Sequence, residues 1–327
     1  MTEIFRESDD VSRETSPGKT VTTDDVSRET SSENPIEHEA RHAMSVLSAA
    51  GQEWPRPAGT RVFTVANQKG GVGKTTTTVN VAAALALHGQ RVLVIDLDPQ
   101  GNASTALGVD HQVGTPSIYD VLLGGDKIAD VCTEVSISPN LFCVPATIDL
   151  AGADIELTSQ VAREYRLRRA VTDFLETGPN LDYIFIDCPP SLGLLTLNAL
   201  VAAREVLIPI QCEYYALEGL AQLLSTVDLV KAHLNPELAV TTVLLTMYDS
   251  RTRLADQVAD EVREHFGVLV VDAVIPRNVR VSEAPGFGQT VITYDPGSRG
   301  AIGYLQAAQE IARRSLQAIQ AAEGNES

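Results

Sequence analysis

The stretch Lys69-Gly70-Gly71-Val72-Gly73-Lys74-Thr75-Thr76 decides the fold of this 327-residue chain. It directly follows the apolar stretch Arg61–Asn67, which predicts a buried strand, and it opens a helical pattern over Thr75–His88. A strand, a glycine-rich turn and a helix in this order form the context of a phosphate-binding loop, in which backbone N–H groups converge on phosphate oxygens. We therefore expect Lys74 to reach the β- and γ-phosphates of a nucleotide and the Thr75 hydroxyl to bind Mg²⁺.

Outward from this loop, the hydrophobic pattern alternates between strands and helices. Further strands are expected at Arg91–Asp96, Leu141–Pro145, Asp182–Asp187, Glu205–Ile210, Val240–Met247 and Val268–Ile275, and further helices at about Ser159–Glu176, Leu194–Ala203, Ala216–His233, Leu254–Phe266 and Ala301–Ala322. Such alternation predicts an α/β fold with a doubly wound, mostly parallel sheet flanked by helices. The pattern indicates one domain over residues 60–322, followed by a disordered C-terminus at 323–327.

Residues 1–59 have a different composition and predict a disordered, acidic tail rich in Ser and Thr. The octapeptide Asp9–Ser16 recurs without change at Asp24–Ser31. This repeat is either a tandem duplication in an unconstrained tail or a bivalent docking motif. A short helix is expected between Ile36 and Ala50, and the stretch from Trp54 to Gly59 is expected to be a linker.

The charge and the cysteines limit the function classes. With 25 basic and 43 acidic residues, the net charge of −18 argues against a generally basic nucleic-acid coat protein but leaves room for a local basic patch. The four cysteines contain no CxxC pair, so neither a disulfide framework nor a zinc site is expected. No apolar run is long enough to span a membrane and no signal-peptide pattern is present, so we expect a soluble cytoplasmic protein.

Three carboxylates follow the expected strands. Asp96 and Asp98 end the strand Arg91–Asp96 two residues apart, so their side chains are expected to point the same way. Asp187 ends another apolar strand, a Walker B pattern in which the carboxylate reaches Mg²⁺ through water. The alternative for Asp96 and Asp98 is a structural one, in which they cap the helix that follows.

The loop departs from the common GxxxxGK[ST] pattern, because Gln68 stands where the first glycine would be and Lys69 precedes the paired glycines. This KGGxGK[ST] form resembles the deviant Walker A motif of the MinD/ParA superclass of P-loop ATPases. The resemblance implies a nucleotide-sandwich homodimer in which Lys69 reaches the partner subunit's ATP. It also implies that Asp98 orients the attacking water and that Asp96 helps to hold the Mg²⁺ shell.

Six further segments resemble the chromosomal ParA (Soj) partitioning ATPases, and the resemblance covers residues 61–320. These segments are Asp98–Ser104, Pro145–Leu157, Asp187–Leu195, Gln211–Gly219, Leu244–Arg251 and Ile275–Pro285. The resemblance implies a Mg²⁺-dependent ATP hydrolase, weak unless it is stimulated by DNA and by a ParB-type centromere-binding partner. Its ATP dimer would bind double-stranded DNA without sequence preference, associate with the nucleoid and be released by hydrolysis.

The resemblance also assigns binding residues in the C-terminal half. Adenine is expected against Pro276, Arg277 and Asn278, and DNA against Arg251 and Arg280. From charge alone, Arg251 beside Asp249 and Arg280 beside Glu283 would be ordinary surface ion pairs.

Four alternatives remain open. A MinD-like membrane switch needs a basic amphipathic C-terminal helix, whereas this chain ends in Ala-Ala-Glu-Gly-Asn-Glu-Ser, which favours packing on the core without membrane insertion. A nitrogenase-iron-protein-like reductase would need two cysteines for a bridging cluster, but no pair, Cys132 and Cys143 included, stands in the motif that such a cluster requires. A plasmid-partitioning ATPase and a DNA-bridging protein with a vestigial ATPase are the other two. A polar scaffold or another partner could be recruited through the tail.

Overall fold

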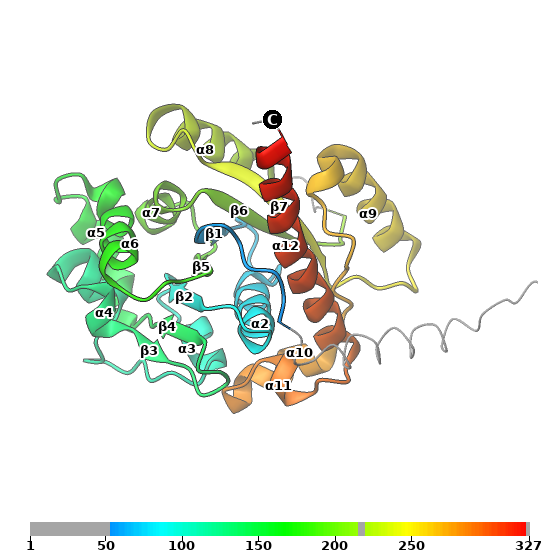
Figure 1. The fold of residues 1–327 in the computed structure, drawn as a ribbon, viewed down its shortest axis with the longest axis horizontal. Helices are drawn as coiled ribbons and strands as arrows, with labels where there is room; N and C mark the ends of the chain where they lie inside the picture. The colour runs from blue at the N-terminus through cyan, green and yellow to red at the C-terminus, as the bar shows by residue number, and fades with distance from the viewer. Residues whose placement is uncertain (1–52, 215–219, 325–327) are drawn as a thin grey trace, which may run out of the picture.

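The computed structural model describes residues 53–214 and 220–324, with side chains as far as Arg314. Its centre is a seven-stranded sheet with the order β3-β4-β2-β5-β1-β6-β7 (Figure 1). The strands are β1 Arg61–Val65, β2 Val92–Asp96, β3 Thr133–Glu134, β4 Leu141–Val144, β5 Tyr183–Asp187, β6 Glu205–Gln211 and β7 Ala239–Thr246. All neighbouring strands pair in parallel except β3 and β4, so the predicted fold class is confirmed.

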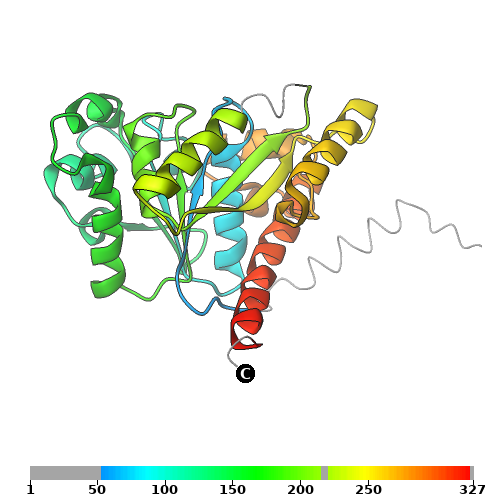
Figure 2. The ribbon, with the colours of Figure 1, turned by 90° about the horizontal axis from the view of Figure 1, so that it is seen from above.

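Helices cover both faces of this sheet (Figures 1 and 2). The longer ones are α2 Lys74–Leu87, α6 Arg166–Thr177, α7 Leu194–Ala202, α8 Leu220–His233, α9 Arg253–Phe266 and α12 Arg299–Gly324. The shorter ones are α3 Asn102–Ala106, α4 Ile128–Val131, α5 Ala153–Leu157, α10 Val279–Glu283 and α11 Val291–Tyr294. Single turns of other helix types lie at η1 Asp120–Gly124, η2 Ile148–Gly152, η3 Arg163–Tyr165, η4 Gly267–Leu269 and η5 Ala284–Phe287.

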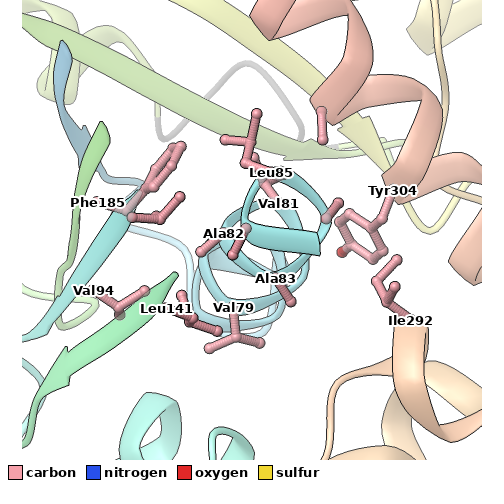
Figure 3. Close-up of a cluster of buried hydrophobic side chains, with 14 of the residues drawn as sticks. Val79, Val81, Ala82, Ala83, Leu85, Val94, Leu141, Phe185, Ile292 and Tyr304 are labelled. Atoms are coloured by element: carbon pink, nitrogen blue, oxygen red, sulfur yellow. The ribbon is translucent and has the colours of Figure 1, made fainter. Parts of the chain in front are cut away.

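The central strands are buried on both faces, and their alternate side chains enter two different cores. Phe63, Val94 and Phe185 pack with α2 and α12 on one face. Their neighbours along the strands, such as Leu93 and Ile184, pack with α5, α6 and α7 on the other. Figure 3 shows α2 lying between Phe185 of the sheet and Tyr304 of α12. A helix enclosed in this way holds the loop at its N-terminus in a fixed position.

Six of the seven expected strands are confirmed to within about two residues, but the one at Val268–Ile275 is wrong. This segment begins with η4 and then runs beside β7, where Val271 N donates to Val243 O (2.9 Å) and Ile275 N to Leu245 O (2.8 Å). Between them Asp272 N turns away and donates to the Glu310 carboxylate at 3.0 Å, which interrupts the ladder. The expected helix over Ser159–Glu176 also starts late, because Ala162 adopts a left-handed conformation (φ 50°).

The expected linker is packed at its start. Trp54 is buried, stacks on the His88 ring at 3.8 Å and donates its backbone N–H to His88 O at 3.1 Å. Gln90 Nε2 donates to Trp54 O at 2.8 Å, and Arg56 donates to Gly89 O at 2.8 Å. The packed domain therefore starts before Arg61. Residues 54–56 form a strap that contacts the residues directly after α2, at the end of the helix away from the glycine-rich loop.

The earlier part of the tail, with the repeated octapeptide and the helix expected at Ile36–Ala50, lies outside the described residues. At the other end, α12 continues to Gly324, two residues into the expected disordered C-terminus. None of the described helices is both long and apolar enough to cross a membrane.

Replacing Trp54 by Ala should lower the free energy of unfolding by about 2–4 kcal/mol, because the variant loses a buried aromatic side chain and its stacking partner. The measurement is denaturant unfolding followed by circular dichroism. Arg56→Ala is the matched control, since its side chain is 54% exposed, and it should cost less than about 1 kcal/mol. Equal effects from both variants would mean that Trp54 does not anchor the strap.

Candidate functional site

The loops that follow β1, β2 and β5 meet at the carboxyl edge of the sheet, where parallel α/β folds bind ligands. They surround a cavity of about 740 Å³. Its lining comprises Gly70, Gly71, Gly73, Lys74, Thr75, Thr76, Val79, Asp98, Pro99, Gln100, Asn102, Thr105, Ala106, Ala151, Pro190, Met247, Val281, Ser282 and Pro285. The glycine-rich loop and Asp98 are thus brought together as predicted.

Side chains from the sheet hold the glycine-rich loop in place. Asn67 donates to Pro209 O at 2.8 Å and accepts from the backbone N–H of Lys69 at 3.0 Å. Thr246 at the end of β7 donates to Val72 O at 2.8 Å. Gly71 and Gly73 have φ values of 74° and 92°, a region that other residues adopt only with strain. No side chain caps the N-terminus of α2, so a phosphate can take that place.

Lys74 lies in this loop with only 7% of its surface exposed. Its Nζ lies 3.4 Å from Lys69 O. Burial lowers the pKa of Lys74, while electrostatic attraction, chiefly to Asp187, acts in the opposite direction. A buried ammonium without an ion pair closer than 4 Å among the described residues is well suited to an anionic ligand.

Asp187 is fully buried at the end of β5 and accepts two hydroxyl hydrogen bonds, from Thr75 Oγ1 (2.7 Å) and from Thr78 Oγ1 (3.0 Å). Burial and the nearby charge of Asp96 raise the pKa of Asp187 to about 8, although both threonine bonds oppose the rise. Thr75 and Asp187 supply the hard oxygen donors that Mg²⁺ prefers, and Mg²⁺ usually needs few protein ligands beside phosphate and water. The residues present therefore fit the predicted metal site.

Asp96, the third predicted metal residue, has other partners. Its Oδ2 accepts from the backbone N–H (2.9 Å) and the hydroxyl (2.7 Å) of Ser104, and its Oδ1 accepts from Asp98 N (3.1 Å). Burial raises its pKa to about 6. Asp96 does not line the cavity, whereas Asp98 does. The sequence does not predict that Thr78 and Ser104 bond to these carboxylates, because nothing in the pattern of a helix shows which carboxylate a hydroxyl residue within it will contact.

Lys69 is held within its own subunit. Its Nζ lies 3.3 Å from Glu213 Oε2, and Arg277 lies 3.6 Å from the other oxygen of that carboxylate. Gln211 Nε2 donates to the same carboxylate at 2.5 Å. Glu213 was not predicted as a site residue, although it follows the end of β6 in the same way that Asp98 follows β2.

The residues expected to contact adenine lie beside the cavity. Pro276, Arg277 and Asn278 do not line it, whereas Met247, Val281 and Ser282 do. Asn278 instead caps α10, where its side chain accepts from Arg280 N at 2.8 Å. Adenine contact by residues 276–278 stays a prediction.

The two arginines expected to bind DNA are exposed and paired with acids. Arg251 forms a bidentate ion pair with Asp249 (2.8 and 2.7 Å), and its side chain remains 84% exposed. Arg280 lies 2.9 Å from Glu283 and 3.4 Å from Asp295, with 53% exposure. The charge-based alternative of surface ion pairs therefore describes them in the isolated subunit.

Known proteins are similar to this chain over most of its length. A family model described as "AAA domain" matches residues 60–240. The sporulation initiation inhibitor protein Soj of Bacillus subtilis is 54% identical over 252 residues, which cover 77% of this chain and 98% of that protein. The chromosome partitioning protein ParA of Caulobacter vibrioides is 52% identical over 254 residues, covering 78% and 94%. The chain belongs to the ParA/Soj family.

Solved structures agree with this membership. A Mycobacterium smegmatis protein solved with ADP and magnesium, under the name cobyrinic acid a,c-diamide synthase, superimposes with a TM-score of 0.67 at 40% identity. The match covers 78% of this chain and 94% of that one.

The raised pKa of Asp187 gives a prediction for the nucleotide-free protein. A carboxyl group with a folded-state pKa of about 8 contributes stability that is fully present below its unfolded value near 4 and is lost as pH rises through 8. Between pH 5 and 8 the wild type should therefore lose stability more steeply than Asp187→Asn, by up to about 1.4 kcal/mol per pH unit. Denaturant unfolding at a series of pH values measures both slopes, and identical slopes would show that Asp187 is ionised in the folded protein throughout this range.

Proposed function

We propose that this chain is a ParA-type ATPase that partitions chromosome origins, cycling between a nucleotide-sandwich dimer that binds DNA and a released monomer. The observation that carries the proposal is the convergence of Lys74, Thr75, Asp98 and Asp187 on one edge of the sheet, with Lys69 at the rim. The relatives named chromosome partitioning protein ParA and Soj support the cellular role. A ParB-type protein would be the partner that stimulates hydrolysis.

The residues divide the chemistry of hydrolysis among them. Lys74 and the loop N–H groups would hold the phosphates of ATP, and the Thr75 hydroxyl, which donates to Asp187 in this structure, would be a ligand of Mg²⁺. Asp187 and Asp96 would hold the water shell of that metal. Bound Mg²⁺ would neutralise developing charge on the phosphoryl oxygens. Asp98, which faces the cavity, orients the attacking water.

Lys69 provides the link between ATP and dimerisation. In the isolated subunit its ammonium lies against Glu213. To reach the ATP of a partner subunit it must leave this carboxylate, and the more negative triphosphate is the stronger attraction. ATP bound in a second subunit thereby supplies the reason for Lys69 to move, and the dimer would form only while the γ-phosphate is present.

The packing of α12 bears on the membrane alternative. Its apolar stripe in the described part, at Tyr304, Leu305, Ala308, Ile311 and Ala312, is buried against the core. A membrane-binding helix would need such a stripe to be free. This observation favours DNA over a lipid surface as the polyanion that the ATP form binds.

The central experiment measures binding of a random-sequence DNA duplex by fluorescence anisotropy with ATP and with ADP. The wild type should bind only with ATP, and Arg280→Glu or Arg251→Glu should weaken that binding at least about tenfold. Arg280→Ala should flatten the dependence of log K on log salt by about 2, because each dimer loses two phosphate contacts. Arg204→Glu is the control, since the exposure of Arg204 (68%) lies between those of Arg251 and Arg280 and it is likewise paired with an acid, Glu237.

The possible failures of this experiment have separate meanings. Absence of ATP-dependent binding by the wild type would overturn the proposed function, and co-sedimentation with liposomes would then test a membrane role. Normal binding by Arg280→Glu would leave the function standing and move the DNA-binding surface elsewhere.

Glu213→Gln should lower the ATP concentration needed for half-maximal dimerisation by up to about fivefold, because a partly exposed ion pair to Lys69 is worth about 1 kcal/mol or less. The measurement is sedimentation velocity in an Asp98→Ala background that slows hydrolysis. Glu237→Gln, which breaks the exposed pair with Arg204, is the matched control. Weaker dimerisation of the Glu213 variant would refute its role as a restraint on the monomer.

A further inference from the structure

The segment that carries Asp98 is a short loop between β2 and α3. Asp98, Pro99, Gln100 and Asn102 all line the cavity, so the loop forms one wall of the nucleotide site. Within the loop, Asp98 Oδ1 accepts from Gln100 N at 3.0 Å, which fixes the direction of the Asp98 carboxylate relative to its own backbone. The position of that carboxylate in the cavity therefore depends on what holds the two ends of the loop.

One buried carboxylate holds both ends. Asp96 Oδ1 accepts from the backbone N–H of Asp98 at the start of the loop (3.1 Å). Asp96 Oδ2 accepts from Ser104 in α3, through the backbone N–H (2.9 Å) and through the hydroxyl (2.7 Å). Asp96 and Ser104 are both completely buried, so water does not compete for the two hydrogen bonds between them.

The same hydroxyl reaches a third element. Ser104 Oγ accepts from the backbone N–H of Ala146, just beyond β4, at 3.2 Å. With its one proton donated to Asp96 and a lone pair taken by Ala146, the hydroxyl is used on both sides. Ser104 thus ties the loop to two strands of the sheet at once.

On the side away from the cavity, the loop is tightly packed at Gly101. Gly101 has φ 63°, and a Cβ at this position would lie 2.6 Å from His111 Cδ2 and 3.1 Å from Ala146 O. Thr105 Oγ1 donates to Gly101 O at 3.0 Å and lies 3.2 Å from His111 Nε2. A loop that lost its tie to Asp96 could therefore not shift toward His111 and Ala146.

We propose that Ser104 is a positioning residue for ATP hydrolysis: through Asp96 its hydroxyl sets the position of Asp98 against the attacking water. The proposal rests on the proposed function and gives Asp96 a role beyond the water shell of the metal. Loss of the hydroxyl leaves a charged, buried oxygen with one donor fewer, which the loop can compensate only by shifting. A shift of about 1 Å at a group that orients a reactant can slow a reaction by up to about 100-fold.

The test compares Ser104→Ala, Ser104→Thr and Ser117→Ala in the full-length chain. Ser117 is the matched control: it is a buried serine whose N–H (2.9 Å) and hydroxyl (3.3 Å) both donate to Asp120, outside the nucleotide site. Two quantities are measured: the dissociation constant of a fluorescent ATP analogue with Mg²⁺, and the rate of ATP turnover at saturation. The Ser104 N–H bond to Asp96 survives in every variant, so the fold should be kept.

Ser104→Ala should lower turnover at least about tenfold while the dissociation constant changes less than about twofold. Ser104→Thr should keep most of the turnover, because it keeps the hydroxyl, and Ser117→Ala should match the wild type. The proposal fails if Ser104→Ala turns over normally, if its nucleotide affinity falls in parallel with turnover, or if Ser104→Thr is as slow as Ser104→Ala. A wild type that binds the analogue but does not hydrolyse ATP would instead overturn the proposed function.

Discussion

The constraint on which the site depends is the burial of two carboxylates side by side without a cation closer than 4 Å among the described residues. Asp96 and Asp187 occupy the same register on the neighbouring strands β2 and β5, and both are fully buried. Burial raises the cost of ionising both carboxylates, and the charge of Asp96 adds to this cost for Asp187. Their hydrogen-bond donors in the described chain are hydroxyl and backbone N–H groups. The site is therefore built to be completed by a cation from outside. A divalent cation that arrives with a nucleotide would balance the charge of Asp187, and the buried Lys74 would balance the charge of the phosphates. The cation and the nucleotide would therefore bind better together than either would alone.

The sequence predicts the parts of this site that depend on the order of elements along the chain. A strand, a glycine-rich turn and a helix in register require Lys74 and Thr75 to lie at the carboxyl edge, and parallel pairing then brings Asp98 and Asp187 to the same edge. It does not predict partners that meet across the fold. The contacts of Thr78 with Asp187 and of Glu213 with Lys69 join residues far apart in the chain. The contact of Ser104 with Asp96 spans only eight residues, but it depends on how the loop between β2 and α3 folds back.

The errors in the fold have the same origin. The pattern over Val268–Ile275 is that of a strand, but Glu310 of α12 captures the Asp272 N–H that a continuous ladder would use. Proline-rich sequence around Trp54 is typical of a linker, yet a ring that can stack on His88 gains more from burial than the short segment loses in conformational freedom. In both places a tertiary contact overrides a local preference.

The negative charge of the chain bears on how it could bind DNA. Residues 1–60 hold 6 basic and 12 acidic side chains, so the tail accounts for −6 of the net −18 and the domain still carries −12. Arg251 and Arg280 are in addition matched by acids in the isolated subunit. A single subunit is therefore repelled by DNA at a distance and has little to offer it at contact. In the proposed cycle, a dimer would double the number of phosphate contacts. Because the binding constant rises exponentially with that number, the affinity for DNA would increase far more than twofold when two subunits join. An acidic protein with few available arginines would on this account suit a reversible cycle better than a basic one. Its separated subunits would have too little affinity for DNA to remain bound.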